Sequence, residues 1–165
     1  MTTVAEMLSS MVSGRPLFIG VGNPGRGDDA AGIALVELIS TAFPHLCLNA
    51  GDVPENHLEK ACRRRPDTVI FVDATEMGLP AGSIRLFPAA SLTDGAVSSH
   101  ALSLKTAAEY LRRRCGANVV VLGIQPDRIS AASGLSRAVG EAVRTTAEQI
   151  VEHLRRCPPF PAAKG

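Results

Sequence analysis

The sequence predicts a three-layer α/β fold, in which helices cover both faces of a twisted and mostly parallel sheet. Short apolar runs alternate along the 165 residues with longer segments of helical periodicity, and this order typically builds parallel sheets with right-handed crossovers. The runs Leu17–Gly22, Val69–Val72 and Val119–Ile124 are continuously apolar, as in strands that are buried on both faces. Because no internal repeat or linker interrupts the pattern, we expect one domain over residues 1–165.

The remaining elements follow from periodicity and from Gly and Pro positions. In chain order, we expect helices at Val4–Val12, Ile33–Ala42, Pro54–Arg65, Ser103–Arg114 and Leu135–Arg156. A short strand is expected at Leu46–Ala50. The segment Ser83–Phe87 alternates in polarity and is bounded by Gly82 and Pro88. We expect it to be a short extra strand at an edge of the sheet, where it can run antiparallel. Residues 1–14 would add an N-terminal helix outside this pattern, and 157–165 a flexible tail rich in Pro and Ala.

Composition excludes several classes of function. The chain has 17 Lys and Arg against 16 Asp and Glu, so it has no broad basic surface for a nucleic acid. No apolar run approaches the roughly 20 residues of a membrane span. The four cysteines have no CxxC spacing, which indicates neither a zinc cluster nor a secreted disulfide framework. With Glu6 and no early Lys or Arg, the first residues are a poor signal peptide. We therefore expect a cytoplasmic protein; we also expect a monomer, although composition does not determine the oligomeric state.

Polar residues follow the predicted strands where those strands end. Asp28 and Asp29 follow the first strand, Asp73 follows Val69–Val72, and His100 lies in a loop before a helix. In open α/β sheets, ligands bind beyond the carboxyl ends of the strands. Asp29, Asp73 and His100 can therefore meet in one crevice. Two carboxylates and an imidazole suit a divalent transition metal and leave positions open for ligands from a substrate.

Simpler interpretations of the same residues stay open at this point. Asp28 can cap the following helix, which leaves Asp29 to point into the crevice, and Asp73 can cap a turn. His100, which follows two serines, can be an ordinary residue at a helix entry. The segment Gly20-Val-Gly22-Asn-Pro-Gly25 matches GxGxxG, but the acidic pair stands where a pyrophosphate would bind and would repel it. We expect no nucleotide cofactor.

The motifs together resemble those of the hydrogenase maturation endopeptidases, and among them the branch that processes the large subunit of the formate-hydrogenlyase type hydrogenase. Five blocks carry the resemblance, in the family's order and within residues 17 to 155: Gly20-Val-Gly-Asn23 with Gly27-Asp28-Asp29; Pro54-Glu55-Asn56; Val72-Asp73-Ala-Thr-Glu-Met-Gly78 through Gly82-Ser-Ile-Arg85; Ser98-Ser-His100; and Leu122-Gly-Ile-Gln-Pro-Asp127. Any single block would be weak evidence, whereas the set is specific.

The resemblance implies a peptidase that cuts a C-terminal extension from the immature large subunit of a nickel–iron hydrogenase. It implies that Asp29, Asp73 and His100 bind nickel that the substrate brings. Either Asp29 or Asp73 then acts as general base on a water, or the metal itself polarises the carbonyl or activates the water, and the sequence leaves these routes open. Because the three ligands include no thiolate, we expect no cofactor that is tightly bound at rest. The alternatives are a nickel-sensing chaperone that holds the precursor without cutting it and, less favoured, a nucleotide-binding α/β protein that uses the glycine loop. Two positions depart from the family pattern, because Ala30 replaces a common Gly and Asn49 stands near the usual Asp of the second strand.

Overall fold

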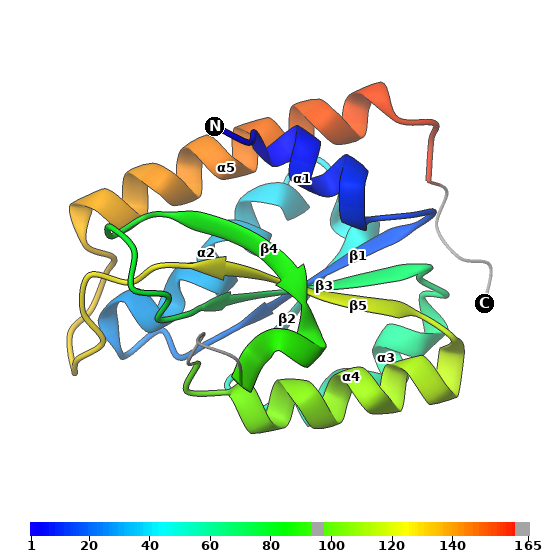
Figure 1. Cartoon of the computed structure of the whole chain (residues 1–165), viewed down its shortest axis with the longest axis horizontal. Helices are drawn as coiled ribbons and strands as arrows, with labels where there is room; N and C mark the ends of the chain where they lie inside the picture. Colours follow the sequence, from blue (N-terminus) through cyan, green and yellow to red (C-terminus); the bar gives the residue numbers. More distant parts are fainter. Residues whose placement is uncertain (94–97, 161–165) are drawn as a thin grey trace.

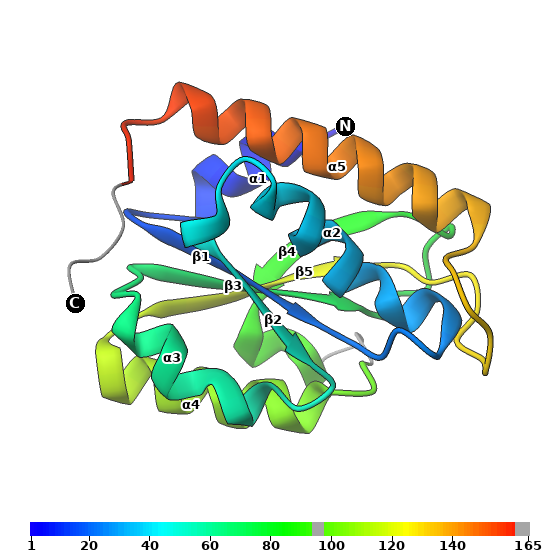
Figure 2. The ribbon, with the colours of Figure 1, turned by 180° about the vertical axis from the view of Figure 1, so that it is seen from behind.

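A computed structural model describes residues 1–93 and 98–160. Its centre is a five-stranded sheet in the order β2-β1-β3-β5-β4, as Figure 1 and Figure 2 show from opposite sides. The strands are β1 (Pro16–Val21), β2 (Cys47–Gly51), β3 (Thr68–Ala74), β4 (Ile84–Pro88) and β5 (Asn118–Ile124). Four of them are parallel, and β4 alone runs antiparallel, at the edge beside β5. The α/β fold and the extra edge strand are therefore confirmed.

The helices form two outer layers. The α-helices are α1 (Val4–Met11), α2 (Ala31–Ser40), α3 (Leu58–Arg63), α4 (Ala101–Cys115) and α5 (Arg137–Arg156), and short 3-10 helices are η1 (Gly27–Ala30), η2 (Pro44–Leu46), η3 (Pro54–His57) and η4 (Ala89–Thr93). Helices α1, α2 and α5 cover one face of the sheet, and α3 and α4 cover the other (Figure 1). None of the helices in the described residues is long and apolar enough to cross a membrane.

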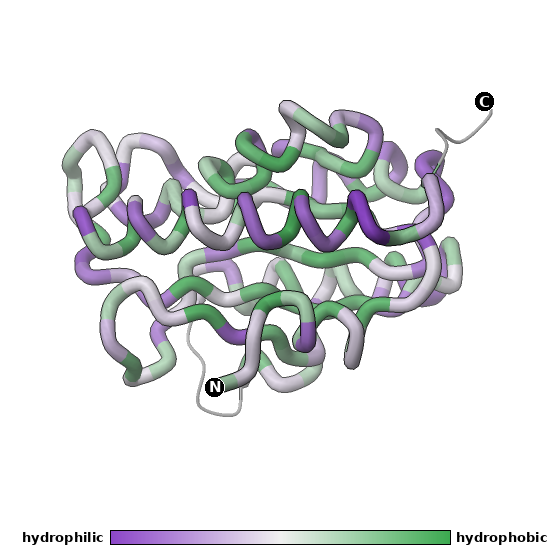
Figure 3. The backbone as a smooth tube through the Cα atoms, turned by 90° about the horizontal axis from the view of Figure 1, so that it is seen from above, coloured by the Kyte–Doolittle hydropathy of each residue, from purple (hydrophilic) through white to green (hydrophobic). Residues whose placement is uncertain are grey.

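The core consists of two apolar clusters, one on each face of the sheet. Every residue of β1 and β3 is buried, which explains why these strands appear in the sequence as continuous apolar runs. Helix α5 instead buries one stripe, Val139, Val143, Thr146, Ala147, Ile150 and Leu154, at the spacing of one helical face. Figure 3 accordingly shows largely hydrophobic strands between helices of mixed hydropathy.

Several expected boundaries were wrong. The helix expected at 54–65 is split into η3 and α3, because Pro54 starts a 3-10 turn before the α-helix begins at Leu58. Asp73 is not beyond its strand but inside it, paired with Gly123 of β5. Residues 161–165 of the expected tail lie outside the described part of the chain.

Candidate metal-recognition site

Asp29, Asp73 and His100 meet at the carboxyl ends of the strands, as the sequence predicted. Asp29 lies on η1, the next element after β1, Asp73 is the next-to-last residue of β3, and His100 is the N-cap residue of α4. One potential ligand atom from each of the three lies within 4.8 Å of the others. Three segments far apart in the sequence thus place two carboxylates and one imidazole around one point.

Glycines allow Asp29 to reach this point. Gly22 has a φ of +148°, and a Cβ atom there would lie 1.9 Å from the backbone oxygen of Asp29. Gly32 approaches the sheet closely, because a Cβ atom at this position would lie 2.0 Å from the backbone oxygen of Val72. The Asn23 N–H donates to Asp29 Oδ2 over 3.1 Å, which leaves Oδ1 facing the site. The glycine motif therefore serves a tight turn and close packing.

The Asp73 side chain lies between Ser98 and His100. The Ser98 hydroxyl donates a hydrogen bond to Asp73 Oδ2, whereas His100 Nδ1 lies 3.3 Å from Asp73 Oδ1. The Ser98 Oγ atom also accepts a hydrogen bond of 3.0 Å from the His100 backbone N–H. The two oxygens of Asp73 consequently have different surroundings, one held by a hydroxyl and the other directed at the histidine.

The charges in the site affect each other's titration. Burial raises the pKa of Asp73, while the contacts with His100 and Ser98 oppose that rise. The neighbouring Asp73 carboxylate raises the pKa of His100, and burial opposes it. An ionised carboxylate with a raised pKa is a stronger proton acceptor than an ordinary one, and perturbed groups of this kind are common at functional sites.

Three buried atoms of the site have no hydrogen-bond partner outside the group in the described residues: Asp29 Oδ1, and the pair Asp73 Oδ1 and His100 Nδ1, which lie 3.3 Å from each other. Buried polar atoms without partners are costly and call for an explanation. Each of these three is a ligand atom for a divalent transition metal, since imidazole nitrogen and carboxylate oxygen both suit such ions. The donor set therefore fits a divalent metal ion, and its three protein ligands are fewer than the four or more that such ions usually bind.

Asp28 does not cap a helix, contrary to the expectation from its position. Neither η1 nor α2 has a side-chain cap. Asp28 instead accepts hydrogen bonds from the N–H groups of Asp127, Arg128 and Ser136 and from the Ser136 hydroxyl, over 2.7 to 3.1 Å. Asp28 thereby connects two segments, namely the turn that carries Asp29 and the long loop between β5 and α5.

Sequence reasoning missed three residues around the site. Ser98 is 7% exposed although its Ser-Ser sequence is typical of a loop. Gln125 accepts from the N–H groups of Met77 and Leu79 and so shapes the chain after β3. Glu55 is close enough to His100 for the histidine charge to lower the pKa of the glutamate, although its side-chain hydrogen bond with Ser103 has the larger effect. All three stand in the motif blocks of the sequence, but their partners lie 2 to 48 residues away, so the motifs do not reveal these contacts.

The departures from the family pattern leave the three site residues in place. Ala30 is the last residue of η1 and is partly buried. The residue whose backbone lies close against the sheet is Gly32. Asn49 is exposed on β2 and accepts a hydrogen bond of 3.0 Å from the Gly51 N–H.

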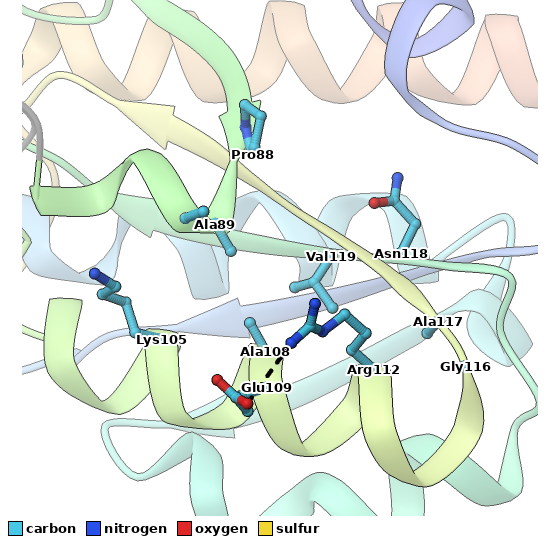
Figure 4. Close-up of a pocket in the computed structure, with 11 residues that line it drawn as sticks. Pro88, Ala89, Lys105, Ala108, Glu109, Arg112, Gly116, Ala117, Asn118 and Val119 are labelled. Atoms are coloured by element: carbon cyan, nitrogen blue, oxygen red, sulfur yellow. Dashed lines mark ion pairs between the residues drawn. The ribbon is translucent and has the colours of Figure 1, made fainter.

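A separate groove of about 490 Å³ lies between the end of β4, the start of β5 and α4. Figure 4 shows it with Lys105 and the Glu109–Arg112 ion pair on the α4 side. None of Asp29, Asp73 and His100 lines this groove. The candidate site is therefore distinct from it.

The fold and the site together define an α/β protein with a converging group of two carboxylates and one histidine at the carboxyl ends of its parallel strands. A family model described as hydrogenase maturation protease matches residues 33–153. The hydrogenase 3 maturation protease of Escherichia coli is 31% identical over 133 residues, which are 79% of this chain and 85% of that relative. A putative hydrogenase maturation protease of Methanocaldococcus jannaschii is 26% identical over 151 residues, 84% of this chain and 89% of the relative.

Solved structures agree with these sequence matches. The crystal structure of a NiFe hydrogenase maturation protease, HycI from Thermococcus kodakarensis, superposes with a TM-score of 0.79 and 31% identity, over 94% of this chain and all of that one. The solution structure of the endopeptidase HycI from Escherichia coli gives 0.71 and 28%, over 84% and 90% of the two chains. The chain belongs to the hydrogenase maturation protease family, and it is a peptidase.

Proposed function

We propose that this peptidase removes a C-terminal extension from the nickel-loaded large-subunit precursor of a nickel–iron hydrogenase, and that Asp29, Asp73 and His100 recognise the nickel in that substrate. The observation that carries the proposal is the set of three buried ligand atoms that converge within 4.8 Å and have no hydrogen-bond partner outside the set. The named relatives support the substrate, because they are hydrogenase maturation proteases.

Recognition follows from an incomplete ligand set. Three protein ligands without a thiolate hold nickel weakly by themselves, so the chain at rest would keep no tightly bound metal. A precursor that already carries nickel supplies the remaining ligands, and both partners then bind the ion together. An unloaded precursor lacks this contact. Asp29, Asp73 and His100 would thereby restrict cleavage to precursors whose metal is in place.

The cleavage step itself needs an activated water near the scissile carbonyl. Asp73 or Asp29 can accept the proton of that water, a contribution of about 10²–10⁴-fold, which would make the chain an aspartyl protease in mechanism. The nickel of the substrate can alternatively polarise the carbonyl. In both routes the same carboxylates are needed, since they hold either the water or the metal.

A cleavage assay tests the proposal with the nickel-loaded precursor, followed by mass spectrometry of the large subunit. The variants Asp29→Asn, Asp73→Asn and His100→Ala should lose on the order of 10²-fold or more in rate. Asp52→Asn is the matched control, because Asp52 is exposed and contributes to the field at His100 without belonging to the converging set. Wild-type rates in all three site variants would overturn the assignment, and an unchanged precursor mass with wild-type protein would support a chaperone instead.

A further inference from the structure

We infer that Ser98 is the positioning residue that prepares Asp73 and His100 for metal recognition. Ser98 is buried, its hydroxyl donates to Asp73 Oδ2, and its oxygen accepts from the His100 backbone N–H. No other side chain among the described residues hydrogen bonds to both of these site residues. The inference rests on the proposed function of the site and adds a residue to it.

The first role of Ser98 concerns the choice of ligand atom on Asp73. A carboxylate has two oxygens, and without a constraint it can rotate or bind an ion through both of them. The Ser98 hydroxyl fixes Oδ2, so Oδ1 is the oxygen that faces His100 Nδ1 at 3.3 Å. Asp73 thus presents one defined ligand atom, and the ring of His100 lies beside it.

The second role concerns the backbone of His100. His100 is the N-cap residue of α4, and its side chain makes no capping hydrogen bond. The hydrogen bond of 3.0 Å from its N–H to Ser98 Oγ closes a two-residue turn that fixes the entry of the chain into the helix. One hydroxyl therefore joins the end of β3 to the start of α4. The distance between the two ligands depends on it.

Residues that hold metal ligands from behind typically change metal affinity or activity by 10- to 100-fold when they are removed. Ser98 meets the description of such a residue, since its hydroxyl donates to Asp73 and its oxygen accepts from the His100 N–H, so both of these hydrogen bonds hold proposed ligands. The neighbouring Ser99 is exposed and provides a matched control for composition and chain position.

The test is a titration of the full chain with Ni²⁺, in which paramagnetic broadening of amide NMR signals near Asp29, Asp73 and His100 reports binding, even when it is weak. Ser98→Ala should raise the midpoint by about 10- to 100-fold, whereas Ser98→Thr, which keeps the hydroxyl, should stay within about threefold of wild type. Ser99→Ala should match wild type. Amide spectra of each variant without metal establish that the fold is retained.

Asp73→Asn in the same titration separates two kinds of failure. If Asp73→Asn weakens Ni²⁺ binding and Ser98→Ala does not, the positioning role of Ser98 is wrong while the proposed site stands. If neither variant changes the midpoint, the proposed site is wrong and the role of Ser98 falls with it. If Ser98→Ala does not fold, the Ni²⁺ midpoints of Ser98→Thr and Ser98→Val are compared instead, because these two side chains have the same shape and only Thr has the hydroxyl. Equal midpoints for that pair would also overturn the inference.

Discussion

Replacing Asp28 by Asn should destabilise the protein through a loop that lies 99 to 108 residues further along the chain. Asp28 is 1% exposed, and its carboxylate accepts four hydrogen bonds from Asp127, Arg128 and Ser136. Three of the four reach Oδ2 and one reaches Oδ1. An asparagine can offer its carbonyl oxygen to the group of three, but its NH₂ group then faces the Ser136 N–H.

The magnitude follows from this geometry. One buried N–H without a partner costs about 1–3 kcal/mol, and the three remaining hydrogen bonds lose the strengthening that a charged acceptor gives. Removal of a buried charge offsets part of the loss. We expect a net destabilisation of about 2–4 kcal/mol, and therefore a Tm lower by at least roughly 4 °C.

The pH dependence has a defined sign. Burial works to raise the pKa of Asp28, but the hydrogen bonds from Ser136, Arg128 and Asp127 outweigh it and hold the pKa below its ordinary value of 3.8. The carboxylate therefore stabilises the fold fully above pH 3.8 and loses this contribution as the pH falls through the lower folded pKa. The difference between wild type and Asp28→Asn should shrink over that range.

Urea unfolding measured at neutral and acid pH checks both parts of this prediction. Asp127→Asn is the control, because it removes a charge from an exposed side chain of the same loop. A free energy of unfolding for Asp28→Asn within about 0.5 kcal/mol of wild type at neutral pH would refute the assignment of Asp28 as the anchor of the loop, since changes of that size are ordinary for surface substitutions.

Two further predictions concern packing and reactivity. Gly32→Ala should destabilise the fold by about 1–3 kcal/mol or more, because its Cβ atom would lie 2.0 Å from Val72 O and force α2 away from the sheet; thermal unfolding measures this, and an unchanged Tm would contradict the close approach. Cys47 should resist a thiol reagent in the native protein, since burial raises the pKa of its thiol to about 12. Peptide mapping after labelling measures the rate at Cys47 in the native protein and in urea. Equal rates under the two conditions would contradict the burial of Cys47.

The sequence predicted the layers of the fold, and a crevice that Asp29, Asp73 and His100 can share, because both depend on local patterns, whereas the proposed role of these residues came from the family resemblance. Continuous apolar runs mark buried strands, and side chains that follow parallel strands gather at one edge of the sheet. The order β2-β1-β3-β5-β4 was not predictable in the same way, since hydrophobic periodicity identifies strands without identifying their neighbours.

The roles of Asp28 and Ser98 were beyond local reasoning for a related cause. An acid before a helix usually caps it, but the hydrogen bonds of Asp28 go to residues 99 to 108 positions further along the chain. Ser98 appears in the sequence as a loop serine, and its contact with Asp73 spans 25 residues. Such contacts depend on how the loops fold over the end of the sheet.

The most direct test of the central claim compares cleavage of nickel-loaded and nickel-free precursor by the wild-type chain. If Asp29, Asp73 and His100 recognise nickel in the substrate, the loaded precursor should lose its C-terminal extension and the nickel-free precursor should stay intact over the same time. Equal cleavage of both precursors would contradict the account, because the three converging ligand atoms would then have no part in selecting the substrate.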